Sequence, residues 1–222
     1  MKTFNSPLTA PTLALLTSAA LAIPALAQDK PASAESKTTT AKVELSEAEM
    51  MAKMLELAKP NENHQLLAGL VGNWSFVTKM WMAPGAPPSE SQGTAVRKPL
   101  MDGRYFLAEF SGKMEMPGAD GKMHPVEFKG MSVDGYDNVK KKFVSSWIDN
   151  MGTSIVLSEG TYDPATKTIT YTADMEIVPG MKTKVREVVK IVDHDHHTFE
   201  EFETRGDGQE AKMLEINYVR QK

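Results

Sequence analysis

The chain has 222 residues, no cysteine, a formal charge of −4 at pH 7 and a pI of about 5.8. This length suits one β domain with a sizeable core plus appendages, and the lack of cysteine excludes disulfides, thiolate catalysis and iron–sulfur sites. Because acidic and basic residues are well mixed and no basic stretch stands out, we expect no nucleic-acid partner.

The first residues have the features of a secretory signal. Lys2 is the only charge before Asp29, residues 13–23 are apolar but too short to span a bilayer, and Ala25-Leu26-Ala27 fits the small-residue cleavage pattern. We therefore expect a signal peptide over residues 1–27, cleavage after Ala27, a periplasmic or secreted protein and no membrane span after cleavage. An uncleaved anchor or a buried helix is the alternative that these signals leave open.

Two segments separate this signal from the main domain. Residues 28–42 are mostly Ala, Ser, Thr, Lys and Pro, which predicts a disordered linker. Ser46 followed by Glu49 forms a capping box, and Pro60 ends the apolar positions that recur at helical spacing. The sequence therefore predicts an amphipathic helix within residues 43–60, which we expect to pack on the main domain or to plug one end of it.

Residues 61–222 change from helical to period-two patterning. A short helical segment over residues 63–71 leads into Gly72-Asn73-Trp74, and strand-length runs separated by turn residues follow. The runs cover residues 74–82, 93–100, 104–110, 126–133, 142–148, 154–159, 168–177, 182–192, 198–204 and 212–220. About ten consecutive strands with short connections predict an antiparallel meander that closes into an up-and-down β-barrel.

Three of the predicted hairpins share one turn pattern. An Asp opens the turn, a basic residue follows four positions later, and an apolar residue starts the next strand. The three segments are 136–143, 162–169 and 192–199. This pattern places His194-Asp195-His196-His197 at a hairpin tip, where we expect the side chains to point into water.

Metal binding is the main alternative to that interpretation. His194, His196 and His197 are potential zinc or copper ligands, and the 15 methionines include the pair Met114 and Met116. Thioethers favour Cu(I) in an oxidising compartment, so a periplasmic copper- or zinc-binding protein remains a second hypothesis. Methionine is also an ordinary filler of apolar surfaces, and the primary expectation is no metal and no cofactor.

The aromatic residues and the missing catalytic motifs favour a binding protein over an enzyme. The rings could line a cavity or fill the barrel completely. The sequence contains no nucleophile elbow, phosphate loop, HExxH motif or dinucleotide fingerprint. We therefore expect a small apolar or amphipathic ligand, bound without turnover, and no catalytic residues; a hydrolase or isomerase remains open, and the oligomeric state is not predicted.

Gly72-x-Trp74 after a short helix, with Arg220 in the last strand, resembles the signature of lipocalin and calycin barrels. In that signature the indole closes one end of the barrel and a basic residue packs over its ring. A longer set of motifs resembles the bacterial domain of unknown function 1579 family over about residues 64–220. It comprises His64-x-x-Leu67-x-x-Leu70-x-Gly72-x-Trp74, Gly93-Thr94, Gly103-Arg104-Tyr105, Gly135-Tyr136-Asp137, Trp147-x-Asp149, Gly152-Thr153, Gly160 and Met213-Leu214-Glu215-Ile216-x-Tyr218-x-Arg220.

The resemblance implies a lipocalin-like fold and no established reaction. Two of the matching residues, Arg104 and Glu215, are hard to explain as surface positions. Arg104 in the barrel mouth, with Trp147 and Tyr218, could bind an amphipathic ligand that carries an acidic group. These three residues and Glu215 are our candidate ligand-binding residues. An Arg paired with a carboxylate at the rim is the structural alternative.

Overall fold

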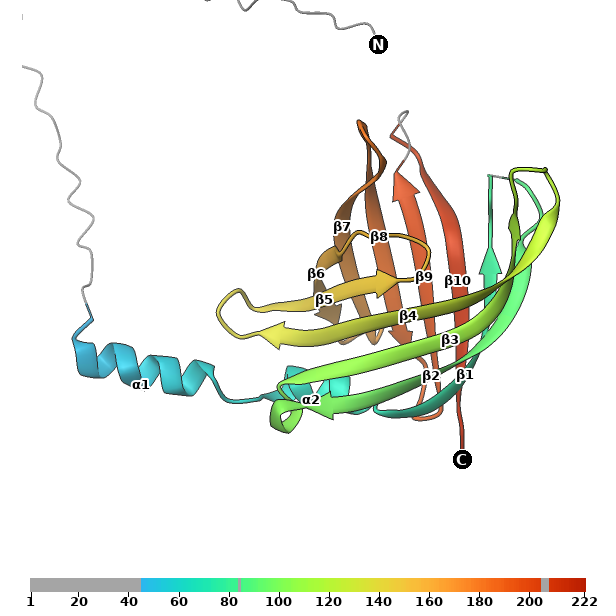
Figure 1. The fold of residues 1–222 in the computed structure, drawn as a ribbon. Coiled ribbons are helices and arrows are strands. Elements are labelled where there is room, and N and C mark those ends of the chain that lie inside the picture. The colour runs from blue at the N-terminus through green and yellow to red at the C-terminus, as the bar shows by residue number, and fades with distance from the viewer. Residues whose placement is uncertain (1–44, 84, 205–207) are drawn as a thin grey trace, which may run out of the picture. The chain divides into compact units, whose positions relative to one another are not determined.

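Two helices precede the sheet in the computed structural model, which describes residues 45–83, 85–204 and 208–222 (Figure 1). Helix α1 (Glu47–Leu57) begins at the predicted capping box, where the Ser46 side chain accepts from the Glu49 N–H. Helix α2 (Glu62–Ala68) follows and leads directly into the first strand. No helix in the described ranges is long and apolar enough to cross a membrane. The predicted signal peptide and linker lie outside the described residues.

The strands form one closed antiparallel barrel, which confirms the predicted fold class. Each strand pairs with its neighbours in the chain, and β1 pairs with β10 to close the ring. In the described part of the chain the strands are β1 (Gly72–Met80), β2 (Ser89–Leu100), β3 (Tyr105–Pro117), β4 (Met123–Asp137), β5 (Lys142–Asp149), β6 (Val156–Asp163), β7 (Thr168–Val178), β8 (Met181–Ile191), β9 (His196–Thr204) and β10 (Glu210–Arg220).

The expectation that α1 packs on the barrel or plugs it is wrong. None of its residues is buried, and Met50, Met51, Met54 and Leu55 are all more than half exposed. The end of the helix is nevertheless tied to the β4–β5 turn, because the Asn138 amide donates to the carbonyls of Leu57 and Lys59. The helical periodicity predicted the helix correctly but not what its apolar side contacts.

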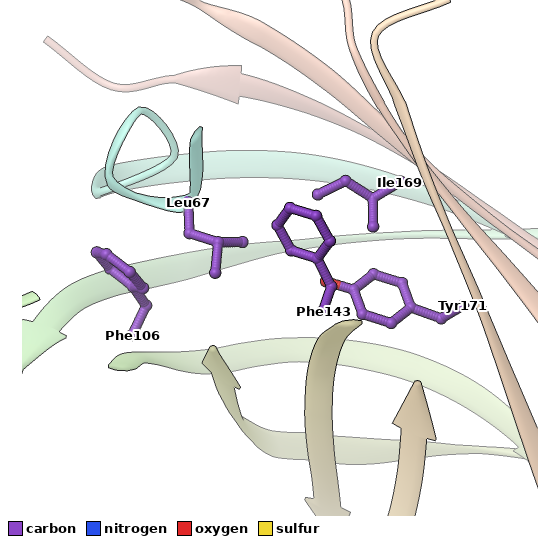
Figure 2. Packing of buried hydrophobic residues seen from close by; sticks show 5 residues of the cluster. All are labelled: Leu67, Phe106, Phe143, Ile169 and Tyr171. Atoms are coloured by element: carbon purple, nitrogen blue, oxygen red, sulfur yellow. The ribbon is translucent and has the colours of Figure 1, made fainter. Parts of the chain in front are cut away.

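Helix α2 covers one end of the barrel instead. Its Leu67 side chain is 1% exposed and reaches toward Phe106 and Phe143 (Figure 2). Ile169 and Tyr171 complete this cluster from β7. Burial of these large apolar side chains contributes about 1.5–3 kcal/mol each, so this end is the main hydrophobic core. We call it the closed end.

Two of the three predicted turns follow the shared pattern, and the third does not. The carboxylates of Asp137 and Asp163 accept backbone N–H groups within their turns, and Lys141 and Lys167 both have a φ of 55°. In the third hairpin β9 already begins at His196, and the His197 side chain is buried at 6% exposure. The prediction that His197 points into water is therefore wrong, because the shorter turn places it on the interior face.

Candidate functional site

The closed end is sealed by Trp74 and Arg220. The Arg220 guanidinium carbon lies 4.2 Å from the centre of the Trp74 ring, and the two residues are register partners on β1 and β10. Arg220 also donates to the carbonyls of Val71 at 2.6 Å and Gly69 at 2.8 Å. The indole N–H donates to the Leu70 carbonyl at 3.0 Å. This arrangement brings together the residues of the predicted barrel closure and ties the end of α2 to the last strand.

Gly72 is required by this closure. Its φ is +140°, a conformation that other L-residues rarely adopt, and a Cβ there would lie 2.5 Å from Arg220 Nη1. The guanidinium can cross over Trp74 because residue 72 has no side chain. The Gly-x-Trp pattern is therefore a steric requirement of the cation–π contact.

Above the closed end, the interior becomes partly exposed and its wall is aromatic. Trp74 and Phe76 are buried, whereas Phe110 and Phe199 pack against their cluster and are only half-buried. Trp147 contacts Phe110 with ring centres 5.2 Å apart and stacks on Phe128 at 6.2 Å. We call the partly exposed side chains of Phe110, Phe128, Trp147 and Phe199 the aromatic cup. They alternate onto the interior faces of β3, β4, β5 and β9.

A buried ion pair crosses the interior beside the cup. Arg97 on β2 lies 2.9 Å from the Asp134 carboxylate on β4, and Asp134 is 5% exposed. The same carboxylate accepts from the hydroxyls of Ser132 at 3.1 Å and Ser145 at 2.7 Å. These contacts compensate the cost of burying Asp134, and they use the Arg97 charge inside the barrel.

Three further carboxylates face the interior from neighbouring strands. Glu187 on β8 lies directly opposite Glu201 on β9, and Glu203 lies opposite the fully buried Val185. Burial raises the pKa of Glu201 to about 7, and the nearby charges of Glu187 and Glu203 add to this shift. Burial also raises the pKa of Glu187, and Asp134 adds to the shift while a hydrogen bond from Ser158 opposes it. Unlike Asp134, these groups have carboxylates as their charged neighbours.

His197 lies on the same interior face of β9, two interior positions before Glu201. Its ring stacks on Tyr218 at 4.2 Å and meets the Trp74 ring edge-to-face at 4.3 Å. Burial, with Arg97 and Arg220 nearby, lowers the pKa of His197 to about 3, so the imidazole is neutral. Its Nδ1 is buried and has no hydrogen-bond partner among the described residues.

The predicted ligand-binding residues do not come together in one place. Arg104 is partly exposed beside the 3₁₀ turn η1 (Met101–Gly103) and donates to the Met101 carbonyl. The Glu215 carboxylate pairs with Lys212 at 3.0 Å in a network that also includes Glu200. Trp147 and Tyr218 do face the interior, in the wall of the aromatic cup and in the buried layer beneath it. The interior cation is thus Arg97 rather than Arg104.

The residues of the metal hypothesis lie at opposite ends of the barrel. His194 is in the β8–β9 turn and pairs with Asp195, and His196 is the first residue of β9 and pairs with Asp193. Met114 and Met116 lie near the β3–β4 hairpin at the open end. Across the described ranges, no group of three or more His, Cys, Asp or Glu side chains could hold a metal ion.

Several interior polar residues were missed, although their signal is present in the sequence. Val185-x-Glu187-x-Val189 places a carboxylate among alternating apolar residues, and Asp134 stands two positions before the aromatic Tyr136. Residues two apart on a strand share a face, so these acids belong to the interior. Other strand carboxylates do lie on the solvated face, such as Glu109, a partner of Lys98.

Two shallow hollows lie on the barrel surface and share residues of β2. The larger, of about 540 Å³, is lined by residues of β2, β3 and β4, including Thr94, Ser111 and Lys113. The smaller is lined by residues of β1, β2 and β10. Gly93 lines both, at a position where the Phe76 ring packs against the backbone. Neither hollow contains the interior carboxylates.

Comparisons with known proteins place the chain by family and by fold. No curated protein matches it. The solved structure of Rv2717c from M. tuberculosis is 14% identical, with a TM-score of 0.51 over 74% of this chain and all of that one. A protein of unknown function from the DUF3598 family of Nostoc punctiforme matches 73% of this chain at 7% identity, with a TM-score of 0.25. The likeness to Rv2717c supports the fold alone, because the identity is 14%. The family model "Protein of unknown function (DUF1579)" matches residues 59–220, and the chain therefore belongs to the DUF1579 family.

Proposed function

We propose that this protein is an exported barrel that binds a small apolar or amphipathic molecule in the aromatic cup without chemical turnover. The observation that carries the proposal is the contrast between the two ends of the barrel. Leu67, Phe106 and Phe143 are each 1% exposed at the closed end, whereas the inward-facing Phe110, Trp147 and Phe199 remain partly exposed. Apolar rings that solvent can reach inside a concave wall are typical of a ligand site.

The energetics agree with a binding role. A ligand that covers these rings removes apolar surface from water, at about 25 cal/mol per Å². The barrel walls are already held by ten strand pairings, so little of this gain would be lost in ordering the site. The cup would therefore bind through a preformed apolar surface.

Binding is tested with Trp147 and its neighbour on the opposite face. Trp147 faces the cup, whereas Ile148 is 43% exposed on the outer face of the same strand. We expect Trp147→Ala to weaken binding of decanol at least about tenfold, the size of one lost aromatic contact surface. The Ile148→Ala control should bind decanol as the wild type does, as measured by titration calorimetry. Equal affinities for all three proteins would contradict the proposal.

Export is supported by the sequence of residues 1–27. Expression of the full chain in a Gram-negative host should yield a periplasmic protein whose first residue is Gln28. A cytoplasmic or uncleaved product would contradict this part of the proposal.

A further inference from the structure

The row of interior residues next to the aromatic cup is acidic. Glu201 lies two residues beyond Phe199 on β9, and its partner on β10 is Leu214, two residues before Ile216. Phe199 and Ile216 pack on the buried layer of Trp74, Phe76 and Tyr218. Glu201 and the opposite Glu187 therefore stand one interior row closer to the open end than these apolar residues. A molecule whose tail lies on Phe199 would bring its head group to the two carboxylates.

Arg186 on β8 and Lys212 on β10 do not pair with the interior carboxylates. Arg186 and Lys212 alternate onto the outer face, where Arg186 pairs with Glu210 at 2.7 Å and Lys212 pairs with Glu215. The interior cation Arg97 is 2.9 Å from Asp134, so its charge is matched by another carboxylate. Within residues 45–83, 85–204 and 208–222, Glu187, Glu201 and Glu203 form no ion pair, and we call these three carboxylates the acidic wall.

A second, independent feature of the same face is a buried polar atom without a hydrogen-bond partner in the described ranges. His197 is 6% exposed, its ring is neutral, and Nδ1 has no partner in the described part of the chain. It lies one interior row below Phe199 on β9, on the face that carries Glu201. A neutral imidazole has one donor and one acceptor nitrogen, so a polar group of a bound molecule could partner Nδ1 in either tautomer. Ionised carboxylates only accept, so a donor group on a bound molecule would add to the hydrogen bond that Glu187 receives from Ser158.

We propose that Glu187 and Glu201 make the cup selective for amphipathic molecules with a protonated amine head group, and that the cup rejects carboxylates. This inference rests on the proposed function, because it takes the aromatic cup as the place where the tail binds. An ammonium group at this row would donate charge-assisted hydrogen bonds to the carboxylates and would lie close to the face of Phe199, which favours cations. A carboxylate head group would be repelled by the acidic wall.

The test compares three ligands with one tail and three head groups: decylamine, decanol and decanoate, at pH 8. Since hydrogen bonds to charged groups are stronger than those between neutral groups, we expect decylamine to bind at least about tenfold more tightly than decanol. Decanoate should bind more weakly than decanol. Glu201→Gln keeps the shape of the side chain and should reduce the preference for decylamine over decanol about tenfold.

The control removes the same unit of charge from the outer face. Glu90 is on the outer face of β2, 4.0 Å from Lys79, so Glu90→Gln should leave all three affinities unchanged. Glu187→Gln serves as a second interior variant if Glu201→Gln does not fold, as judged by its thermal transition.

The outcomes separate the two proposals. If none of the three ligands binds, the proposed function itself is wrong. If all three bind with equal affinity, or if decanoate binds best, the cup is a ligand site and the charge selectivity is refuted. Selectivity that survives in both interior variants would also overturn the role of Glu187 and Glu201.

Discussion

At the scale of single residues, Arg220 does more than its place at the chain end suggests. It covers the Trp74 ring and donates to the carbonyls of Val71, Gly69 and His194. Arg220→Met keeps an apolar stem over the indole but removes the charge and all three hydrogen bonds. We expect a loss of about 3 kcal/mol in the free energy of unfolding, which urea denaturation would measure.

Arg186 provides the matched control for this variant. Its guanidinium carbon is 4.1 Å from the centre of the Phe202 ring, and it pairs with Glu210, but the pair is solvent-exposed. Arg186→Met should therefore lower the free energy of unfolding by less than about 1 kcal/mol. Equal losses in the two variants would show that Arg220 is an ordinary surface arginine.

His197 gives the closed end a dependence on pH. Its pKa falls to about 3 on folding, so between pH 6.5 and pH 3 the unfolded chain binds the proton that the folded one refuses. Stability from this group is present above pH 6.5 and is lost as the pH falls. Between pH 7 and pH 5, the free energy of unfolding of His197→Phe should therefore fall by about 2 kcal/mol less than that of the wild type. Urea denaturation at each pH measures both.

The control for His197 is His196, which is exposed at the start of β9 and pairs with Asp193. His196→Phe should follow the wild-type profile. The raised pKa of Glu201 acts in the opposite sense, since its protonation favours the folded state below about pH 7, but it is common to all three proteins. Identical profiles for His197→Phe and the wild type would contradict the buried neutral imidazole.

At the scale of elements, the sequence predicted the existence and order of the helices and strands better than it predicted the contacts between them. Period-two patterning predicted all of the strands described here, and the capping box placed the start of α1, because both depend on local spacing. Gly72, Trp74 and Arg220 could be assigned together because the family pattern links positions far apart in the chain. The partner of an apolar helix face, by contrast, depends on tertiary geometry that periodicity does not contain.

The site was harder to predict because it depends on which face each strand turns inward. The turn at residues 193–195 is shorter than the two other turns with the shared pattern, which follow Asp137 and Asp163. This shorter turn brings His197 into the barrel. Counting the alternation from Phe199 would have placed His197, Glu201 and Glu203 on the interior face. Arg104 was predicted to bind a ligand because it belongs to the family motif, yet it lies beside η1. Arg97 was not predicted, although it alternates on β2 with the buried Ala95.

The exposed helix α1 also allows a prediction. Since it buries no side chain, a chain that begins at Pro60 should lose less than about 1 kcal/mol relative to one that begins at Gln28. The loss would come from the two Asn138 hydrogen bonds. Urea denaturation measures the difference, and a loss above about 3 kcal/mol would mean that α1 packs against the barrel in solution.

At the scale of the whole barrel, one ring of strands supports two different ends. The closed end combines the Leu67 cluster with the Trp74–Arg220 contact, and the interior becomes partly exposed toward the open end. Between them lie the Arg97–Asp134 ion pair and the acidic wall of Glu187, Glu201 and Glu203. Rigidity comes from the first end, and the proposed binding of small molecules comes from the second.

The most direct test of this division uses the fluorescence of single tryptophans. In one variant Trp81 and Trp147 are replaced by Phe, which leaves Trp74; in the other Trp74 and Trp81 are replaced, which leaves Trp147. Because Trp74 is 2% exposed and Trp147 lines the aromatic cup, 11-bromoundecanol should quench Trp147 strongly and leave Trp74 unchanged. Equal quenching of both, or quenching of Trp74 alone, would contradict a barrel that is sealed at one end and binds its ligand at the other.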